Sequence, residues 1–347
     1  MRTTAVYFLT IICLFTSWNL AAFDYWQTLP KQPIIPEGNP QTAEKIALGK
    51  QLFFDTRLSL RGEVSCNSCH NLVMGGDDDG AAMNMPQRNI KRSAPSVWNV
   101  GYMSTYFWDA RAKSLEDQAK EHLLDPSIMA MQNSTILESR LKNIKGYVAI
   151  FEKTFVNKEI SLENISKALA SFQRSLIVPD SRADQYIAGN KAALNDKEKR
   201  GYQLFQDQGC LSCHFGTNFA GPAPGPGLKM GDAFYELYPT IRGSMYEEKY
   251  DMISDMGSYH VNLDPEHKLM WRVPSLRNIA DTAPYFHNNA VNDLHEAVRV
   301  MNRIQFNYPI TEEKVDDIVA FLKTLTGIYP KIELPRLPES DGISLVQ

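Results

Sequence analysis

The sequence has few cysteines, no long apolar run beyond its N-terminal region and no excess of basic residues. Five cysteines in 347 residues are too few for a disulfide scaffold. Beyond the N-terminal region no run is long and apolar enough to cross a bilayer. A formal net charge of −4 excludes the basic surface that a nucleic-acid-binding protein needs. No segment alternates polar and apolar residues as a half-buried strand does, which leaves a mainly α-helical protein.

Four of the cysteines lie in two copies of the pattern CxxCH, which are CNSCH at 66–70 and CLSCH at 210–214. In this pattern both thiols add to the vinyl groups of a haem, and the adjacent histidine binds the iron. The predicted haem-binding residues are Cys66, Cys69, His70, Cys210, Cys213 and His214. A four-thiolate zinc site, a redox-active cysteine pair and two disulfides are the alternatives. None of them requires a histidine after the second cysteine of both copies.

Residues 1–22 have the composition of a secretory signal peptide. Arg2 precedes an apolar run, and Ala21 and Ala22 supply the small residues of a cleavage site. We expect cleavage after Ala22. The fifth cysteine, Cys13, lies in this leader and lacks the small residue that normally precedes a lipid-modified cysteine. Because haem is attached to CxxCH motifs outside the cytoplasm, leader and motifs both predict a periplasmic protein without a membrane span after cleavage.

A sequence repeat precedes the two haem motifs. EKIALGKQLFF at 44–54 aligns with EKRGYQLF at 198–205, so that a glycine, a glutamine, a leucine and a phenylalanine coincide. Both segments have apolar residues at helical spacing, with Thr42 and Asn195 as N-caps. A helix, a CxxCH motif, an axial ligand and a closing helix follow one another in a cytochrome c domain. The sequence therefore predicts a mainly α fold of two cytochrome c-like domains, each around one covalently bound haem, with long irregular loops.

The first domain is predicted to span 23–189 and the second 190–347. Further helices are expected where apolar residues recur at helical spacing after a serine, threonine or aspartate, at 114–124, 134–144, 161–178, 294–303 and 311–326. The proline- and glycine-rich stretch 221–227 is expected to be a loop, and the region up to about Tyr259 lacks a clear period.

Several longer motifs resemble the bacterial di-haem cytochrome c peroxidases and their relative MauG, over residues 39–327. They are LGKQLFFDTRLS, APSVWN at 94–99, FWDAR at 107–111, SLEDQA at 114–119, RVPSLRNIADTAPYFH at 272–287 and EAVRVM at 296–301. The resemblance implies that the N-terminal haem reacts with peroxide. It also implies that the C-terminal haem, with histidine and methionine ligands, relays electrons to it from a small cytochrome or cupredoxin.

Met301 matches the family's methionine ligand of the second haem, and thioether ligation raises a haem's potential, as an electron-entry site requires. The alternative is that Met301 is a core residue of its helix. Five other methionines remain candidates if the insertion before Trp271 changes the geometry: Met230, Met245, Met252, Met256 and Met270.

Two further roles follow from the resemblance. Trp108 matches the tryptophan between the two haems, where an indole would divide one long electron-transfer step into two. The alternative is a buried structural tryptophan. Thr282 and Pro284 match positions whose carbonyls hold a calcium ion between the domains, and the third position is Ser93, where relatives have asparagine. A hydroxyl is a poorer calcium ligand than an amide carbonyl.

The chain departs from the family in the peroxide pocket. Gln118 keeps the family's glutamine, but the glutamate position is Ile128. Splitting peroxide needs a group that takes a proton from one oxygen and returns it to the other, and isoleucine cannot do that. Glu121 and His122 are close in sequence and are candidates to replace the carboxylate, although most such residues on a helix are solvated.

The second departure concerns the distal side of the first haem. Many relatives carry a histidine ligand in the loop after the first CxxCH, but no histidine lies between His70 and His122. Counting back from Trp108 places Met85 at that position, so Met85 and the nearby Met83 are candidate thioether ligands. The alternative is an open iron, which would bind peroxide without prior reduction.

We therefore expect a periplasmic di-haem peroxidase that reduces hydrogen peroxide to water, possesses two covalent haems and a calcium ion, and forms a homodimer. A MauG-like oxidase of a partner protein is one alternative, although MauG carries tyrosine where Met301 stands. A di-haem electron-transfer or redox-sensing protein without catalytic activity is the other, which Ile128 and the local methionines favour.

Overall fold

A computed structural model describes residues 26–80, 83, 89–224 and 229–340. Its main helices are α1 (Ala43–Phe54), α3 (Leu115–Leu124), α4 (Ser134–Lys142), α5 (Lys145–Thr154), α6 (Leu162–Ser175), α8 (Asp196–Asp207), α11 (Leu294–Gln305) and α12 (Glu312–Lys323). Shorter helices are α2 (Cys66–Cys69), α7 (Arg182–Ile187), α9 (Met245–Lys249) and α10 (Tyr259–Asn262). The fold is mainly helical, as predicted from the sequence.

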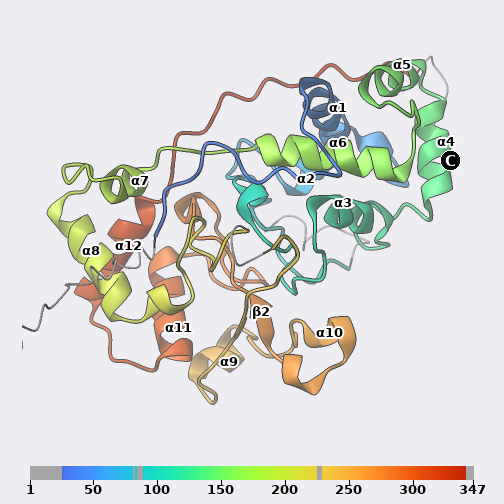
Figure 1. Ribbon diagram of the computed structural model, residues 1–347. Coiled ribbons are helices and arrows are strands. Elements are labelled where there is room, and N and C mark those ends of the chain that lie inside the picture. Colours follow the sequence, from blue (N-terminus) through green and yellow to red (C-terminus); the bar gives the residue numbers. More distant parts are fainter. Residues whose placement is uncertain (1–25, 81–82, 84–88, 225–228, 341–347) are drawn as a thin grey trace, which may run out of the picture.

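In the first half of the chain, α1 packs across α6 at Gly49, and α3 packs on another side of α6 (Figure 1). Thr42 caps α1 by accepting a hydrogen bond from the Lys45 N–H, as its sequence predicted. A Cβ at Gly49 would collide with the carbonyl oxygen of Ala168, so only glycine permits this close crossing. Most buried apolar side chains of this half form one hydrophobic core between Leu48 and Val178, and a smaller cluster includes Met103, Tyr106 and Leu115.

The second half repeats the arrangement. Helix α8 packs across α12 at Gly201, where a Cβ would collide with the Asp317 carbonyl oxygen. Asn195 caps α8 by accepting from the Glu198 N–H, again as predicted. Helix α11 packs on α12, and the second core gathers residues from Ala183 to Leu325. The predicted domain boundary at Gly189 falls after α7, whose Ala183 already belongs to the second core, and it stays a prediction.

The region between the second haem motif and α11 departs from the expected secondary structure, as does α5, where no helix was predicted. Two three-residue strands, β1 (Tyr235–Leu237) and β2 (Met270–Arg272), pair antiparallel, with Glu236 opposite Trp271. No strand was expected from the sequence. Three residues are too few for a polar and apolar alternation to be visible. The helices α9 and α10 lie in the same region, which is at the bottom of Figure 1.

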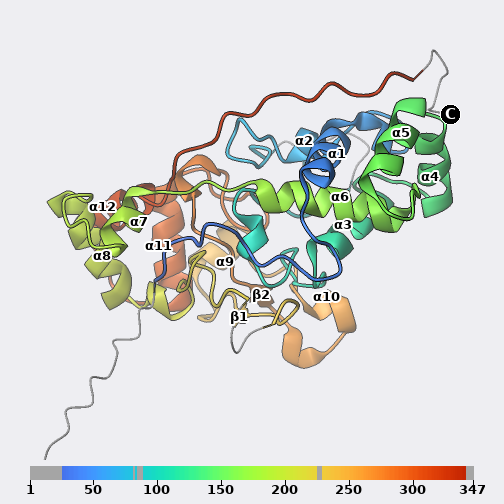
Figure 2. The ribbon, with the colours of Figure 1, turned by 45° about the horizontal axis from the view of Figure 1, so that its top comes forward.

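The two ends of the described chain cross to the opposite halves. Trp26 is buried in the second core, where its ring stacks on Phe321 and its Nε1 donates to the carbonyl oxygen of His214. The segment after α12 runs back along the first half, as both ribbon views show (Figure 1, Figure 2). Tyr329 of this segment packs edge-on against Trp98. The two halves are thus joined by the chain connection and by two exchanged arms, which are the segments that carry Trp26 and Tyr329.

Three expectations concern residues outside the described ranges. The signal peptide at 1–22 lies there, and so do Met85 and part of the loop 221–227. In the described part of the chain, no helix combines the length and the apolar character that a membrane crossing requires.

Candidate active site

One large cavity lies between the two halves and reaches both CxxCH motifs. Its volume is about 1440 Å³, larger than the roughly 300–1,000 Å³ of a pocket for one small ligand. All four motif cysteines and both motif histidines line it. A cavity of this size between two CxxCH motifs fits two haem groups.

The two motif histidines are held in the same orientation. Nδ1 of His70 lies 3.0 Å from the carbonyl oxygen of Pro95, and Nδ1 of His214 lies 2.8 Å from that of Phe219. A carbonyl oxygen can only accept, so the proton is on Nδ1 and the lone pair of Nε2 is free for a metal. Burial lowers the pKa of each imidazole to about 4, which keeps both neutral at physiological pH.

The motif thiols do not have the properties of a redox-active pair. Burial, followed by the neighbouring thiol, raises the pKa of Cys66 to about 12, and burial raises that of Cys210 to about 12. A redox-active cysteine pair needs a lowered thiol pKa, so that alternative does not fit. Within the described ranges no group of three or more histidine, cysteine, aspartate or glutamate side chains is arranged to hold a metal ion, which gives a four-thiolate zinc site no support.

Met301 is the methionine best placed for the second haem. It lies on α11, packs half-buried against the second core, and lines the cavity together with His214. The five alternative methionines do not line the cavity. Among them, Met245 is 72% exposed and Met252 is fully buried beside the hydroxyl of Tyr238. The structure therefore supports Met301 as the ligand over these five.

Trp108 lies where the two halves meet. Phe107 and Ala110 on either side have φ of 66° and 55°, so the segment 106–112 forms a tight loop closed by a bridge between Tyr106 and Ala112. The Trp108 indole N–H donates to the Ser93 carbonyl oxygen at 2.9 Å, and its ring meets His287 edge-on at 6.4 Å. Its ring lines the cavity and contacts the second core, a position between the two motifs that suits a relay.

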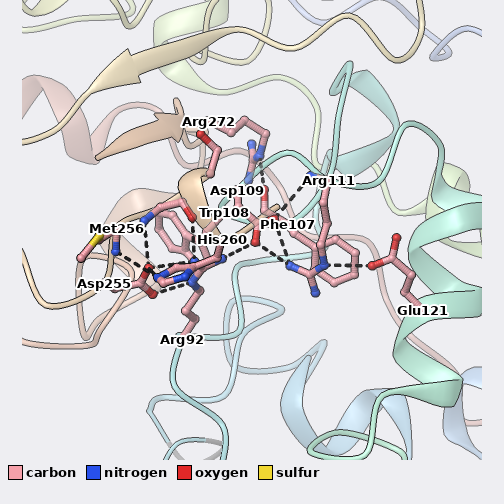
Figure 3. Close-up of polar contacts among 12 residues, drawn as sticks. Arg92, Phe107, Trp108, Asp109, Arg111, Glu121, Asp255, Met256, His260 and Arg272 are labelled. Atoms are coloured by element: carbon pink, nitrogen blue, oxygen red, sulfur yellow. Dashed lines mark hydrogen bonds and ion pairs between the residues drawn. The ribbon is translucent and has the colours of Figure 1, made fainter. Parts of the chain in front are cut away.

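An ion-pair network fixes this loop against the second half. Figure 3 shows Arg92 bridging Asp109 of the loop and Asp255 of the second half, with N–O distances of 2.6 and 2.7 Å. Arg111 joins Asp109 to Glu121, each at 2.9 Å. These contacts limit how far Trp108 can move relative to either motif.

Arg272 is a functional candidate that the sequence analysis did not single out. It is buried beside the cavity and donates to the carbonyl oxygens of Phe107 and Val273. Burial lowers its pKa to about 10, so it remains a cation. In the described ranges it forms no ion pair with a carboxylate side chain. A buried cation without an anion is costly, and a haem propionate would supply the missing charge.

The three predicted calcium residues, Ser93, Thr282 and Pro284, all line the cavity. The Ser93 N–H donates to the His287 carbonyl oxygen, and its own carbonyl oxygen accepts from Trp108. One lone pair of that carbonyl is therefore already used.

The pocket beside the first motif is formed by α3 and the segment after it. Gln118, His122 and Ile128 line the cavity there. His122 is half-buried, its ring centre lies 5.0 Å from that of Phe107, and burial lowers its pKa to about 3. Glu121 instead points outward to Arg111 and is about two-fifths exposed. Of the two candidates to replace the family's glutamate, the structure places only His122 in the pocket.

The structure describes only one of the two methionine candidates for the first haem. Met83 lines the cavity, where its sulfur accepts from the Asn289 side-chain amide at 3.4 Å. Met85 lies outside the described residues.

Comparisons with known proteins agree with this geometry. A family model described as "Di-haem cytochrome c peroxidase" matches residues 43–192, and one described as "Cytochrome c" matches residues 198–326. The chain is 38% identical to the cytochrome c551 peroxidase of Nitrosomonas europaea over 314 residues, 90% of this chain and 89% of that protein. It is 31% identical to the methylamine utilization protein MauG of Methylorubrum extorquens over 333 residues, 92% of this chain and 89% of that protein.

A solved structure gives a similar result. A MauG-like protein associated with microbial copper homeostasis superposes with a TM-score of 0.74 at 28% identity, over 90% of this chain and 96% of that chain.

Proposed function

The chain belongs to the family of bacterial di-haem cytochrome c peroxidases and MauG, and from this premise we propose that it is a periplasmic cytochrome c peroxidase that reduces hydrogen peroxide to water. Peroxide reacts at the first motif, and a small cytochrome c or cupredoxin delivers electrons at the second. The observation that carries the proposal is the single cavity that both CxxCH motifs line.

In this proposal, some residues of the chain bind the haems and another carries electrons between them. A bound haem supplies an iron that exchanges single electrons. His70 and His214 would bind the two irons through Nε2, because the carbonyls of Pro95 and Phe219 hold Nδ1. Met301 completes the second site with a thioether. The Trp108 indole, fixed by its hydrogen bond to the Ser93 carbonyl oxygen, would relay electrons between the two haems.

Proton delivery differs from that of relatives. Reduction of a peroxide molecule to water consumes protons as well as electrons, so the pocket must move protons between oxygens. Gln118 keeps its amide in the pocket, and its Oε1 is buried without a hydrogen-bond partner among the described residues. This amide can hold a substrate oxygen, but it cannot transfer a proton as a carboxylate does.

Calcium and dimer formation belong to the same proposal. The carbonyls of Thr282 and Pro284 and the oxygen atoms of Ser93 would hold one calcium ion beside the cavity, and the proposal includes a homodimer whose assembly depends on this ion. Treatment with a calcium chelator is expected to lower peroxide turnover and the dimer fraction in light scattering, and added calcium to restore both. No change in either quantity would remove calcium from the proposal.

The exported protein provides the main test. Mass spectrometry should find two haems attached to the mature chain. After reduction of the second haem alone, peroxide should oxidise a reduced small cytochrome c or cupredoxin in repeated turnovers, followed by donor absorbance. Two attached haems without any donor oxidation would refute the peroxidase activity.

A second candidate is a di-haem electron-transfer or redox-sensing protein. The apolar Ile128 at the carboxylate position and the imidazole of His122 beside the first motif favour it. It predicts two low-spin haems that stay inert toward peroxide after reduction of the second haem.

A further inference from the structure

The two halves share a second repeat, which is longer than the one before the haem motifs. Residues 95–122 align without a gap with residues 274–301, at a constant offset of 179 positions. Six residues are identical between the two segments: Pro95 and Pro274, Ser96 and Ser275, Asn99 and Asn278, Tyr106 and Tyr285, Phe107 and Phe286, and Leu115 and Leu294.

The backbone follows the same path in both segments. Asn99 and Asn278 have φ of 61° and 60°, and Phe107 and Phe286 have φ of 66° and 72°. Residues other than glycine rarely adopt this conformation, so a match at corresponding positions is not expected by chance. The next loop closes with corresponding bridges, Tyr106 with Ala112 and Tyr285 with Val291.

The anchoring to the core helices is also shared. The Asn99 N–H donates to the carbonyl oxygen of Leu176 just after α6, and the Asn278 N–H donates to that of Leu325 just after α12. The helices that follow, α3 and α11, begin at corresponding residues, with Ser114 and Asp293 as their N-caps. Each position on α3 therefore has a structural counterpart on α11.

The counterpart of Met301 is His122. Met301 is among the α11 residues that line the cavity beside the second motif, and His122 lines the cavity from the corresponding position of α3 beside the first. Both an imidazole nitrogen and a thioether sulfur are axial ligands of haem iron in c-type cytochromes.

The distance between the two imidazoles agrees with this correspondence. The ring centres of His70 and His122 are 6.1 Å apart, with an angle of 35° between the ring planes. A metal bond to an imidazole nitrogen is about 2 Å long, so two rings on opposite sides of one metal have centres about 6 Å apart. A ring that instead hydrogen-bonds to a molecule on the iron lies farther by about 3 Å, the length of a hydrogen bond. The observed distance therefore fits a direct ligand.

Gln118 orients this imidazole. The structure places its side-chain nitrogen Nε2 2.6 Å from Nδ1 of His122, one helical turn away, and leaves Oε1 buried without a hydrogen-bond partner among the described residues, so exchanging the two amide atoms satisfies both groups. An amide presents oxygen or nitrogen at this place with nearly the same shape, and only oxygen accepts from an Nδ1–H. With oxygen there, Nδ1 is protonated and Nε2 has its lone pair free, as for His70 and His214 with their carbonyl partners.

We propose that His122 is the distal axial ligand of the haem at the first motif, the counterpart of Met301 at the second, and that peroxide binds only after His122 has left the iron. This inference rests on the proposed two-haem site and adds a ligand to it. It replaces both the methionine-capped and the open form expected from the sequence. The first site then has two imidazole ligands, and the second has an imidazole and a higher-potential thioether.

The spin state of the oxidised protein tests the proposal. The wild type should contain two low-spin haems in its EPR spectrum, and near-infrared magnetic circular dichroism should show one bis-histidine and one histidine–methionine site. The variant His122→Ala should convert one haem to high spin. Added imidazole should return it to low spin by filling the vacated position, which a structural role would not predict. His295→Ala, on the outer part of α11, serves as the matched control and should leave both spectra unchanged.

Two further measurements complete the test. His122→Met should replace the bis-histidine signal by a second histidine–methionine signal. His122→Ala should also bind peroxide without prior reduction of the second haem. A high-spin haem in the wild type, or a first haem that stays low spin in His122→Ala without imidazole, would overturn the proposal.

These outcomes are distinct from failure of the proposed function. If mass spectrometry finds fewer than two haems on the wild type, the two-haem site itself is wrong. If two haems are present with the expected spectra but no turnover occurs, His122 remains the ligand and the protein is the electron-transfer candidate. The wild-type dichroism spectrum decides the ligation even if every variant fails to fold.

Discussion

The two halves of the molecule use one framework for two different sites. In each, a capped helix crosses a core helix at a glycine, a CxxCH motif follows, and a second helix presents a residue to the cavity. They differ on that second helix: α3 carries Gln118 and His122, whereas the corresponding positions of α11 are Ala297 and Met301. The comparison teaches that the framework fixes the haem, while a few side chains on one helix decide what the haem can do.

The largest effect should come from the attachment residues. Replacing both thiols of a motif by serine, Cys66 with Cys69 or Cys210 with Cys213, should remove one haem in each case and abolish donor-driven peroxide turnover. Mass spectrometry of the exported protein measures the first effect, and donor oxidation the second. The two variants should differ in spectrum: only loss of the second motif should remove the histidine–methionine signal. The same signal lost from both variants would mean that the halves are not separate sites.

A carboxylate in the first pocket should sharpen the difference between the halves. Ile128→Glu restores a group that can transfer a proton between the peroxide oxygens, and such groups contribute about 10²–10⁴-fold to rates. We expect turnover after reduction to rise by up to about 10²-fold, measured by donor oxidation, with Ile128→Gln as a control of the same size. Equal rates in both variants would show that proton transfer is arranged elsewhere.

The two glycine crossings allow the halves to be compared in stability. Gly49→Ala and Gly201→Ala each place a Cβ against a carbonyl oxygen of the facing helix. Overpacking of this kind typically destabilises by about 1–3 kcal/mol. Denaturant unfolding monitored at the absorption of each haem should show Gly49→Ala acting first on the first haem and Gly201→Ala on the second. An alanine at either site without a shift in the midpoint would mean that the helices move apart at no cost.

The smallest effect is expected at the contact between the halves. Trp108→Phe removes the indole and its hydrogen bond to Ser93 but keeps an aromatic ring. Electron transfer from the second haem to the first should slow severalfold without loss of either haem, measured by rapid mixing of the reduced protein with peroxide. Trp98→Phe, a cavity-lining tryptophan on the side of Tyr329, is the matched control. An unchanged rate in Trp108→Phe would remove it from the path.

Much of the framework follows from sequence because its signals are local. The caps Thr42 and Asn195, the period of α6 and the CxxCH motifs each lie within a few residues. What was missed depends on contacts between distant segments. Trp26 joins the second core from far along the chain, and Arg272 is notable only because it is buried without a carboxylate. The constant offset that aligns His122 with Met301 was present in the sequence. It became evidence for a shared structure only when the aligned residues were found to have the same left-handed backbone conformation.

The exchanged arms restrict the order in which the two halves can finish folding. Synthesis makes the N-terminus first, so Trp26 is present long before the core around Phe321 that receives it. Tyr329, which packs on Trp98, is among the last residues to be made. Neither half can therefore complete its packing until the C-terminal segment is made, and a prematurely terminated copy leaves aromatic surface uncovered in both halves.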